Sequence, residues 1–454
     1  MKKILIALSL LFLAPTVFAK TPIKTAIQVT TTVSEGKYSI EDTVRIVRAC
    51  GLDAVVFTDR DFLKWEYGLR PLENVFKKTV EQKSVSTYGI KKYLNAIETA
   101  QKNHPDILLI PGVESAPYYC WEGTPLTKSF VMYDWHKHFL AIGMDKNEDY
   151  QGLPVVGNAG ALRKNFNILL MWPVAGIIAI LLLVVMRRYA YTDVMGRPLG
   201  RTPRYYFLLL LIPLLFLINN YPFCNSTLDP YNRKCSHAVY QNYIDYVKRH
   251  GGLVFWAHPE AKNMQIYQGI YFETMAHHDE LPSYRGYAGF AIFYEGYEVL
   301  GHPGGLWDEM LKDFCEGKRE TPIWVIGASA IEKGDYAAAL KDMHTGVFCQ
   351  HNRKDFLWAL SHGQMYVARG TYSLNFTLNE FSLDKNTLKI KGSFARAKNL
   401  SVTLIEYGKI IASYDVGRDF DLEIPVTKSA KKSYYRAEIK DAGLQVVTNP
   451  VFTG

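Results

Sequence analysis

The chain has 454 residues, 48% of them hydrophobic, which is enough for two domains with large cores. Its formal net charge of +8 is modest for this length, and part of it lies in a short segment between two apolar runs. The basic balance therefore indicates membrane topology and argues against nucleic acid as a partner.

The N-terminus has the pattern of a secretory signal. Met1-Lys2-Lys3 precedes an apolar run from Ile4 to Leu13, and Val17-Phe18-Ala19 places small residues where a signal peptidase reads the chain. We expect residues 1–19 to be removed by cleavage after Ala19. The alternative is an uncleaved N-terminal anchor, and in both cases the chain is exported.

Two more apolar runs lie near the middle of the chain. Phe166 to Met186 carries no charge and is long enough to cross a bilayer as a helix, and Tyr205 to Ile218 is nearly all Leu, Ile and Phe. The short segment between them is basic, which keeps such a loop cytoplasmic; its charged residues are Arg187, Arg188, Asp193, Arg197, Arg201 and Arg204. We predict a transmembrane hairpin over 166–221 in the inner (cytoplasmic) membrane, with both flanking halves on the extracytoplasmic side. The alternative is a pair of buried core helices.

The chain has six cysteines, which an oxidising compartment would expose to disulfide formation: Cys50, Cys120, Cys224, Cys235, Cys315 and Cys349. Cys224 and Cys235 follow the second apolar run and are the candidate disulfide. Spacing does not fix connectivity, and free buried thiols are the alternative for Cys50, Cys315 and Cys349.

The two flanking halves, 20–165 and 222–370, alternate short apolar runs with segments of helical spacing. The predicted strands are Ala26 to Val29, Ala54 to Phe57, Ile107 to Ile110 and Leu253 to Trp256, and the predicted helices are Ile40 to Cys50, Ile90 to Lys102 and Tyr240 to His250. Successive units of this kind imply parallel strands in an α/β barrel or a layered sheet. After about Thr371 the pattern changes to alternating segments separated by turns, which predicts a small β-sandwich over 371–454.

Polar motifs follow the predicted strands in a distinctive order. They are Ser34-Glu35-Gly36, Thr58-Asp59-Arg60-Asp61, Pro111-Gly112-Val113-Glu114, His138 to Gly143, Gly251 to Pro259, Leu306-Trp307-Asp308, Gly327 to Ile331 and Asn449 to Phe452. In this order the motifs resemble the polymerase and histidinol phosphatase (PHP) family of metal-dependent hydrolases. More narrowly, they are similar to the CehA/McbA-type branch, which is related to carbaryl hydrolase.

The resemblance implies a fold and a chemistry. The expected fold is a distorted PHP-type (β/α)7 barrel, interrupted by the transmembrane hairpin and followed by the β-sandwich. Family members bind two or three divalent metals at the barrel mouth and hydrolyse phosphoesters or, in the carbaryl branch, esters and carbamates. Clustered cations suit this chemistry because they lower the pKa of a bound water and neutralise charge on the attacked centre.

The chain departs from the family pattern at three strands. Gln28 and Thr30 stand where the family has a His-x-His motif, and Arg60 stands where it has the histidine of Thr-Asp-His. Ser329 and Ile331 occupy the positions of the late Asp-x-His. A guanidinium cannot be deprotonated to bind a cation, so two- or three-metal catalysis of the family type is not expected.

Glu114, His138 and His258 match the family's metal-ligand positions and could hold one zinc or manganese ion, with Asp59 or Asp61 orienting a water. The alternative is a metal-free pocket in which Glu114 pairs with Arg60. His136 could replace a ligand because it shares a strand face with His138, although an exposed turn is the expected place for it. His277, His278 and His302 lie in a Tyr- and Gly-rich stretch that we expect to be a surface loop.

The leading functional hypothesis is a membrane-anchored PHP-like protein that has lost family catalysis and acts as a binding or scaffolding module. One alternative is an active hydrolase with a single metal. Another is a subunit of a membrane complex that is assembled through the hairpin, for which Pro173 and Gly176 offer a small-residue face.

Overall fold

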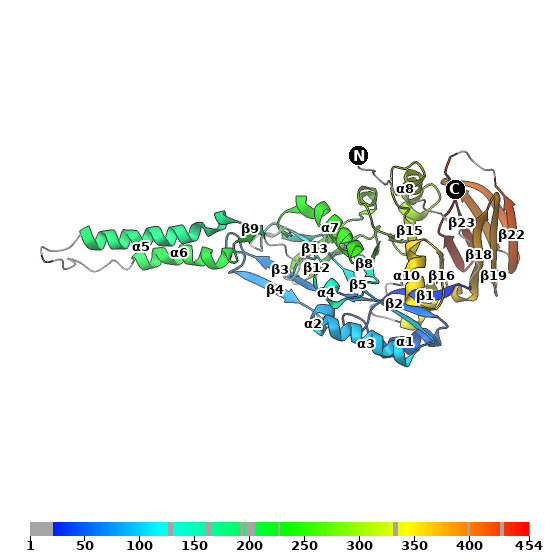
Figure 1. Cartoon of the computed structure of the whole chain (residues 1–454), viewed down its shortest axis with the longest axis horizontal. Coiled ribbons are helices and arrows are strands. Elements are labelled where there is room, and N and C mark those ends of the chain that lie inside the picture. Colours follow the sequence, from blue (N-terminus) through cyan, green and yellow to red (C-terminus); the bar gives the residue numbers. More distant parts are fainter. Residues whose placement is uncertain are drawn as a thin grey trace, which may run out of the picture.

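The computed structural model describes residues 21–125, 130–158, 165–190, 195, 205–225, 228–267, 269–329, 335–396, 400–426 and 431–453. The predicted signal peptide, Ile331 and the arginines at 197, 201 and 204 lie outside these residues. Figure 1 shows an elongated molecule, with a helical hairpin projecting from one end of an α/β body and a group of strands at the other end.

The body is built on a 14-stranded sheet. Its first nine strands are β15 (Trp324–Ile326), β14 (Gly289–Ala291), β11 (Leu253–Trp256), β8 (Phe139–Ile142), β5 (Leu108–Ser115), β2 (Ala54–Arg60), β1 (Ile23–Val29), β16 (Met343–Val347) and β17 (Met365–Arg369), in spatial order. Strands β1, β2 and β5 are parallel, as are β11, β14 and β15.

The expectation of parallel strands throughout is wrong at two places. Strand β8 runs antiparallel to both β5 and β11, and β16 runs antiparallel to β1. The chain between β5 and β8 contains the short strands β6 (Cys120–Glu122) and β7 (Val131–Tyr133) in place of a crossover helix. Without a helical crossover the next strand returns in the opposite direction.

The first strand of this segment, β15, approaches strands β1 and β16 near its other end. The N–H of Ser329, just after β15, donates to the carbonyl of Ile27 in β1 at 2.8 Å, and the N–H of Gly327 donates to Oγ1 of Thr345 in β16 at 2.9 Å. The Asn449 side chain also bonds both backbone groups of Val325. The mixed α/β class is confirmed, whereas a closed seven-stranded barrel stays a prediction because β15 ends the sheet and meets β1 only through such contacts.

The predicted helices occur within a few residues of their expected bounds. The helices of the body are α1 (Ile40–Ala49), α2 (Val85–Tyr88), α3 (Ile90–Asn103), α4 (Asn147–Gln151), α7 (Ser236–Arg249), α8 (Leu306–Cys315), α9 (Tyr336–Asp342) and α10 (Arg353–Ser361). Helix α1 begins after Ser39, whose hydroxyl accepts from the N–H of Asp42. It buries Ile40, Val44 and Val47, which recur on one face at helical spacing.

The apolar runs form a hairpin of α5 (Trp172–Ala190) and α6 (Tyr205–Asn220) that stands clear of the body (Figure 1). A short 3-10 helix, Ile168–Met171, precedes α5, and β9 (Asn165–Phe166) pairs with β10 (Cys224–Asn225) at its base. Among the described residues, Ile168–Arg187 is long and apolar enough to cross a membrane, while the apolar part of α6, Leu208–Asn220, is shorter. Only 6% of the apolar window in the longer segment is buried, so the alternative of two buried core helices is wrong.

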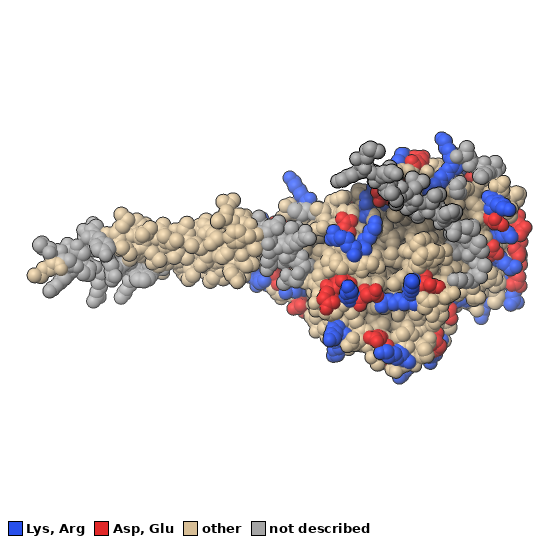
Figure 2. Space-filling view, viewed as in Figure 1, with Lys and Arg blue, Asp and Glu red and all other residues tan. Residues whose placement is uncertain are grey.

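The small-residue face of α5 is used within the hairpin. A Cβ on Gly176 would lie 3.5 Å from Cβ of Pro213 in α6, so the two helices pack closely at this point. Figure 2 shows that the hairpin surface has few charges along its described length, in contrast to the charged surface of the body. The side chains that α5 leaves exposed are larger, among them Ile178, Leu181 and Leu182.

The C-terminal strands form two layers around a shared core. One layer contains β18 (Phe376–Asp384), β19 (Thr387–Phe394) and β22 (Asp419–Pro425); the other contains β20 (Leu400–Glu406), β21 (Lys409–Val416), β23 (Tyr434–Asp441), β24 (Leu444–Thr448) and β25 (Val451–Phe452). Strand β24 pairs with β17, so the second layer continues the sheet of the body across the domain boundary that the sequence predicts at residue 370. Two large apolar clusters fill the body, and a third fills the space between these layers.

Two smaller sheets lie between the body and the hairpin (Figure 1). Strands β3 (Lys64–Gly68) and β4 (Lys77–Glu81) form a ribbon. Strands β12 (Asn263–Tyr267) and β13 (Ile270–Thr274) join β7 and β6 in a four-stranded sheet. Aromatic contacts of Trp65 with Trp121 and Phe272 hold the ribbon against this sheet. The body also contains two short helical segments, the 3-10 helix His278–Ser283 and the π-helical turn Tyr297–Gly301.

Candidate functional site

The residues that resemble the ligand positions of the PHP pattern meet at one edge of the sheet. Arg60 ends β2 and pairs in register with Glu114 near the end of β5. His138 directly precedes β8, and His258 is the second residue after the end of β11. Because β8 is antiparallel to its neighbours, its first residue lies at the same edge as the last residues of β5 and β11. Glu114, His138 and His258 therefore come together although 144 residues separate the first from the last.

Arg60 occupies the centre of this group. Its Nη1 lies 2.8 Å from Oε1 of Glu114 and 2.7 Å from Nδ1 of His138, and its Nε lies 3.4 Å from Oε2 of Glu35. The side chains of Arg60, Glu114 and His138 are all buried. The Oε1 atom of Glu114 has no hydrogen bond of good geometry, so its contact with Arg60 is an ion pair. The sequence-based alternative of an Arg60–Glu114 pair is thus present in the structure.

His138 lies between Arg60 and Glu114. Its Nδ1 is 2.7 Å from Nη1 of Arg60 and 2.8 Å from Oε1 of Glu114, and its Nε2 is 3.3 Å from the carbonyl of Trp135. Burial, followed by the positive charge of Arg60, holds the pKa of His138 well below its usual value of 6.5. His138 is therefore held in its neutral form beside a cation that is built into the chain.

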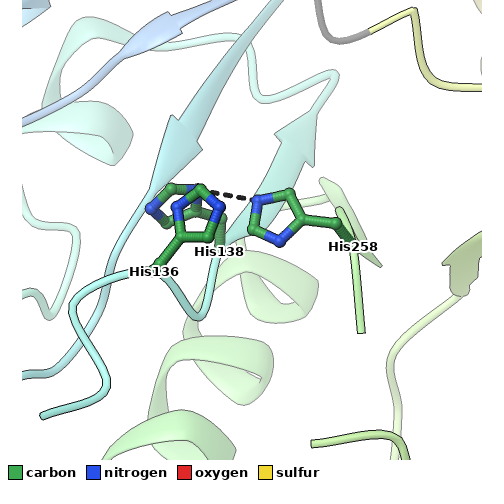
Figure 3. Close-up of side chains that lie close together, drawn as sticks. All are labelled: His136, His138 and His258. Carbon is green, nitrogen blue, oxygen red and sulfur yellow. Dashed lines mark hydrogen bonds between the residues drawn. The ribbon is translucent and has the colours of Figure 1, made fainter. Parts of the chain in front are cut away.

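A third histidine joins the two that were expected. The rings of His136, His138 and His258 lie close together in Figure 3, and one nitrogen from each ring lies within 4.8 Å of one nitrogen of each of the others. The His136 ring stacks on the His258 ring at 4.2 Å, and Nε2 of His258 lies 3.0 Å from Nδ1 of His138. The Nδ1 atoms of His136 and His258 are buried without a hydrogen-bond partner. Two nitrogens thus remain available for a cation.

His136 lies in a turn, as expected, but the expectation that it is exposed is wrong because the residue is half-buried. Its N–H donates to Oγ1 of Thr274 in β13 at 3.1 Å, and burial lowers the pKa of its side chain to about 4. The two-residue spacing from His138 pointed to this residue, although a turn, not an extended strand, brings the two rings together.

His277 is also buried beside this group, in contrast to the surface loop that the sequence predicts. Its N–H donates to the carbonyl of Pro259 at 2.9 Å, and its ring lies 5.1 Å from that of Trp256. Burial and the nearby charge of Lys137 lower the pKa of His277 to about 3. Nothing in the spacing of the sequence distinguishes this residue from its exposed neighbours.

Asp59 and Asp61 are committed to the protein's own groups. Asp59 accepts from the N–H and hydroxyl of Thr31 at 2.7 and 2.9 Å and from the hydroxyl of Ser34 at 2.7 Å, which folds the loop after β1. Asp61 accepts from the N–H of Phe62 at 2.6 Å and from the Ser115 hydroxyl. Burial raises the pKa of both carboxyls, that of Asp61 to about 7.

The other positions at which the sequence departs from the family pattern are occupied by residues with contacts inside the protein. Gln28 is buried with a φ of 63° at an irregularity in the pairing of β1 and β2. The carbonyl of Thr30 accepts from the hydroxyl of Tyr336, and Ser329 is buried with an Oγ that lacks a hydrogen-bond partner. Ile331 is outside the described residues, so this departure has no structural account.

The predicted disulfide between Cys224 and Cys235 is not formed in this structure. Cys224 is a free cysteine whose Sγ lies 3.4 Å from the carbonyl of Pro222. The side chain of Cys235 is outside the described residues, so pairing of the two thiols in an oxidising compartment stays a prediction.

No protein-family model matches the sequence, and no curated protein matches it. The chain is similar to a solved two-domain protein from Bacteroides vulgatus that contains a predicted PHP-like metal-dependent phosphoesterase, with 13% identity over 96% of this chain and 97% of that one and a TM-score of 0.37. It is also similar to a provisionally named metal-dependent phosphoesterase from Bifidobacterium adolescentis, with 16% identity over 69% and 90% of the two chains and a TM-score of 0.30. Scores this low carry no functional argument, so function must be argued from the site itself.

Proposed function

We propose that the protein is a membrane-anchored, extracytoplasmic binding or scaffolding module on a PHP-like fold that has lost multinuclear metal catalysis. The observation that carries this proposal is the position of the Arg60 guanidinium, within 2.8 Å of both Glu114 and His138. These are two of the three retained ligand candidates, and they already surround a permanent positive charge.

An estimate of the electrostatic repulsion between Arg60 and a metal ion supports the loss of a metal cluster. A divalent ion about 4 Å from a guanidinium is repelled by about 8 kcal/mol at an effective dielectric constant of about 20. A second or third ion would add further repulsion, and the chain offers Gln28, Thr30 and Ser329 where additional ligands would be needed. The residues do not fit the family's two- or three-metal centre, so no reaction step is assigned to one.

The test is metal content and turnover of the detergent-purified protein, with Glu114→Ala and His258→Ala in parallel. We expect no stoichiometric metal and no hydrolysis of phosphodiester or ester substrates by the wild type. Turnover in the wild type that disappears in either variant would overturn the proposal. A third variant, Glu98→Ala, changes an exposed carboxylate on α3 and controls for purification.

A second candidate, a hydrolase with a single metal, has one observation in its favour. His136, His138 and His258 could hold one ion, because two of their nitrogens are unpartnered and three imidazoles suit zinc. When bound, such an ion would lower the pKa of a coordinated water. Cobalt substitution distinguishes this donor set from the one expected from the sequence: His136→Ala abolishes the visible absorption if three histidines bind, whereas Glu114→Gln preserves it.

Membrane anchoring is part of the proposal and has its own support. The Ile168–Arg187 segment is apolar, about 30 Å long as a helix, and exposed along its length. Alkaline-phosphatase fusions test the topology directly. Fusions after Gly160 and after Val239 are expected to be active and one after Met195 inactive, while the reverse pattern would contradict the hairpin model.

A further inference from the structure

The loop between β3 and β4, residues 69–76, is fixed to the body end of the hairpin. Asn219, in the last turn of α6, is buried and accepts through Oδ1 from the N–H of Asn74 at 2.8 Å. The side-chain amide of Asn74 donates to the Asn219 carbonyl, also at 2.8 Å, and Nδ2 of Asn219 lies 3.4 Å from the carbonyl of Pro71. The loop therefore lies at the level where α6 ends.

This loop exposes two large apolar side chains at the end of the ribbon. Leu69 is 45% exposed and Phe76 is 53% exposed. The N–H of Leu69 donates to the carbonyl of Phe76 at 2.8 Å, which places the two residues directly opposite each other. Leu69 and Phe76 thus form an exposed apolar pair at the base of the loop, and exposing such a pair to water has a free-energy cost.

Cationic residues flank this apolar pair. Arg70 follows Leu69, and Lys77 and Lys78 follow Phe76, with Glu73 as the acid inside the loop. Glu66 pairs with Lys77 at 3.1 Å and Asp229 lies 3.9 Å from Arg70, so part of the positive charge is balanced within the protein. All three cations are exposed. Apolar side chains with neighbouring Lys and Arg are typical of segments that enter the headgroup region of an anionic membrane surface, where long cationic side chains reach the phosphates.

The hairpin presents matching groups at the same level. Trp172 begins α5 and Tyr221 follows α6, and both rings are exposed. Aromatic rings settle at the interface between lipid and water. Asn220 joins the two helix ends by donating from Nδ2 to the carbonyl of Leu170 at 2.9 Å. The loop, the aromatic rings and the helix ends thus share one boundary.

We infer that the β3–β4 loop is a second membrane contact, whose exposed pair of Leu69 and Phe76 enters the headgroup region of the bilayer that the hairpin crosses. This inference rests on the membrane anchoring proposed above. The occupant is the lipid surface, because the loop is continuous with the apolar hairpin and carries the charge that suits acidic headgroups. Two separate contacts would hold the body at a fixed orientation to the membrane.

The experiment uses the full-length protein in lipid nanodiscs that contain phosphatidylglycerol. The photoreactive residue p-benzoylphenylalanine is introduced separately in place of Phe76, Leu181 and Trp358, and lipid adducts are measured by mass spectrometry after illumination. Leu181 lies within the hairpin. Trp358 is 50% exposed on α10, which Figure 1 places on the part of the body away from the hairpin.

We expect lipid adducts at positions 76 and 181 and none at 358. Adducts at 181 without adducts at 76 would overturn the loop contact and leave membrane anchoring intact, as would a protein adduct at 76 in place of lipid. Absence of adducts at 181 would overturn the anchoring itself and the loop contact with it. Replacing phosphatidylglycerol with phosphatidylcholine is expected to lower the yield at 76 but not at 181, and equal loss at both positions would contradict the role of the flanking cations.

Discussion

Replacing Arg60 by histidine tests whether a single side chain excludes metal from the site. The change restores the residue of the family pattern and removes the guanidinium that lies within 2.8 Å of Glu114 and His138. It therefore removes about 8 kcal/mol of repulsion toward a divalent ion, by the estimate above. It also leaves the buried Glu114 carboxylate without its cation, which costs about 3–5 kcal/mol in a buried pair.

The two effects predict a conditional phenotype. Without metal, the Arg60→His variant is expected to melt below the wild type. With zinc at about 100 times its dissociation constant, the variant regains about 2.7 kcal/mol through binding to the folded state. The wild type is expected to show no such shift, because Arg60 remains in place.

The assay is thermal melting in detergent with and without zinc, combined with equilibrium dialysis of the metal. Arg48→His is the matched control, since Arg48 is an exposed arginine that pairs with Asp106 at the surface. Adding His258→Ala to the Arg60→His variant should abolish the zinc response. The reasoning is refuted if the wild type responds to zinc as strongly as Arg60→His, or if the double variant still responds.

Three further predictions concern stability. Asp308→Ala is expected to lower the free energy of unfolding by about 3–5 kcal/mol, because Asp308 accepts two hydrogen bonds of 2.9 and 2.6 Å from the fully buried Arg436. Urea unfolding measures this loss. The control is Asp313→Ala, an exposed carboxylate on the same helix, which should change stability by less than about 0.5 kcal/mol. The pKa of His136 in the folded protein is about 4, below the usual 6.5, so His136 lowers stability progressively as pH falls from about 6.5 to about 4. His136→Gln should flatten the plot of stability against pH over this range. An unchanged slope in the variant would contradict the prediction. The pKa of Asp61 in the folded protein is raised from 3.8 to about 7, so its protonated form stabilises the fold at low pH, and this contribution is lost as pH rises from about 4 through 7. At pH 8, Asp61→Asn should therefore melt at a higher temperature than the wild type. At pH 4 the two melting temperatures should differ little.

The parts of the fold that the sequence predicts well are those with strong local signals. The apolar positions of α1 recur at helical spacing, and Ile40 to Cys50 was expected where Ile40–Ala49 is found. The direction of β8 could not be predicted, because four apolar residues look the same in a parallel and an antiparallel strand. The β3–β4 ribbon was missed for a related reason: its strands are largely polar and exposed, and contacts with distant aromatic residues hold it in place.

The site was predictable only in part, because its geometry depends on pairs that are distant in sequence. The Arg60–Glu114 pair follows from chemistry once both residues are assigned to neighbouring strand ends. The cluster of His136 with His258 does not, since the stacking requires β8 and β11 to be adjacent and antiparallel. Asp59 has the residue type of a catalytic acid, yet its bonds to Thr31 and Ser34 assign it to loop folding.

The position of the hairpin in the chain does not by itself place the site near the hairpin. The segment that contains it joins β8 to β11, the two strands that deliver His138 and His258, and it leaves the sheet where Ile142 pairs with Leu253. That pair lies at the edge opposite the histidines, so the connection itself does not bring the site to the hairpin.

The β3–β4 ribbon makes that link instead. It begins at Lys64, four residues after Arg60, and its loop is bonded to Asn219 at the end of α6. A five-residue strand spans about 17 Å, so the cation at the centre of the site and the proposed membrane contact are joined by one short ribbon. If the loop rests on the bilayer, the edge that carries Arg60 is held near the lipid surface.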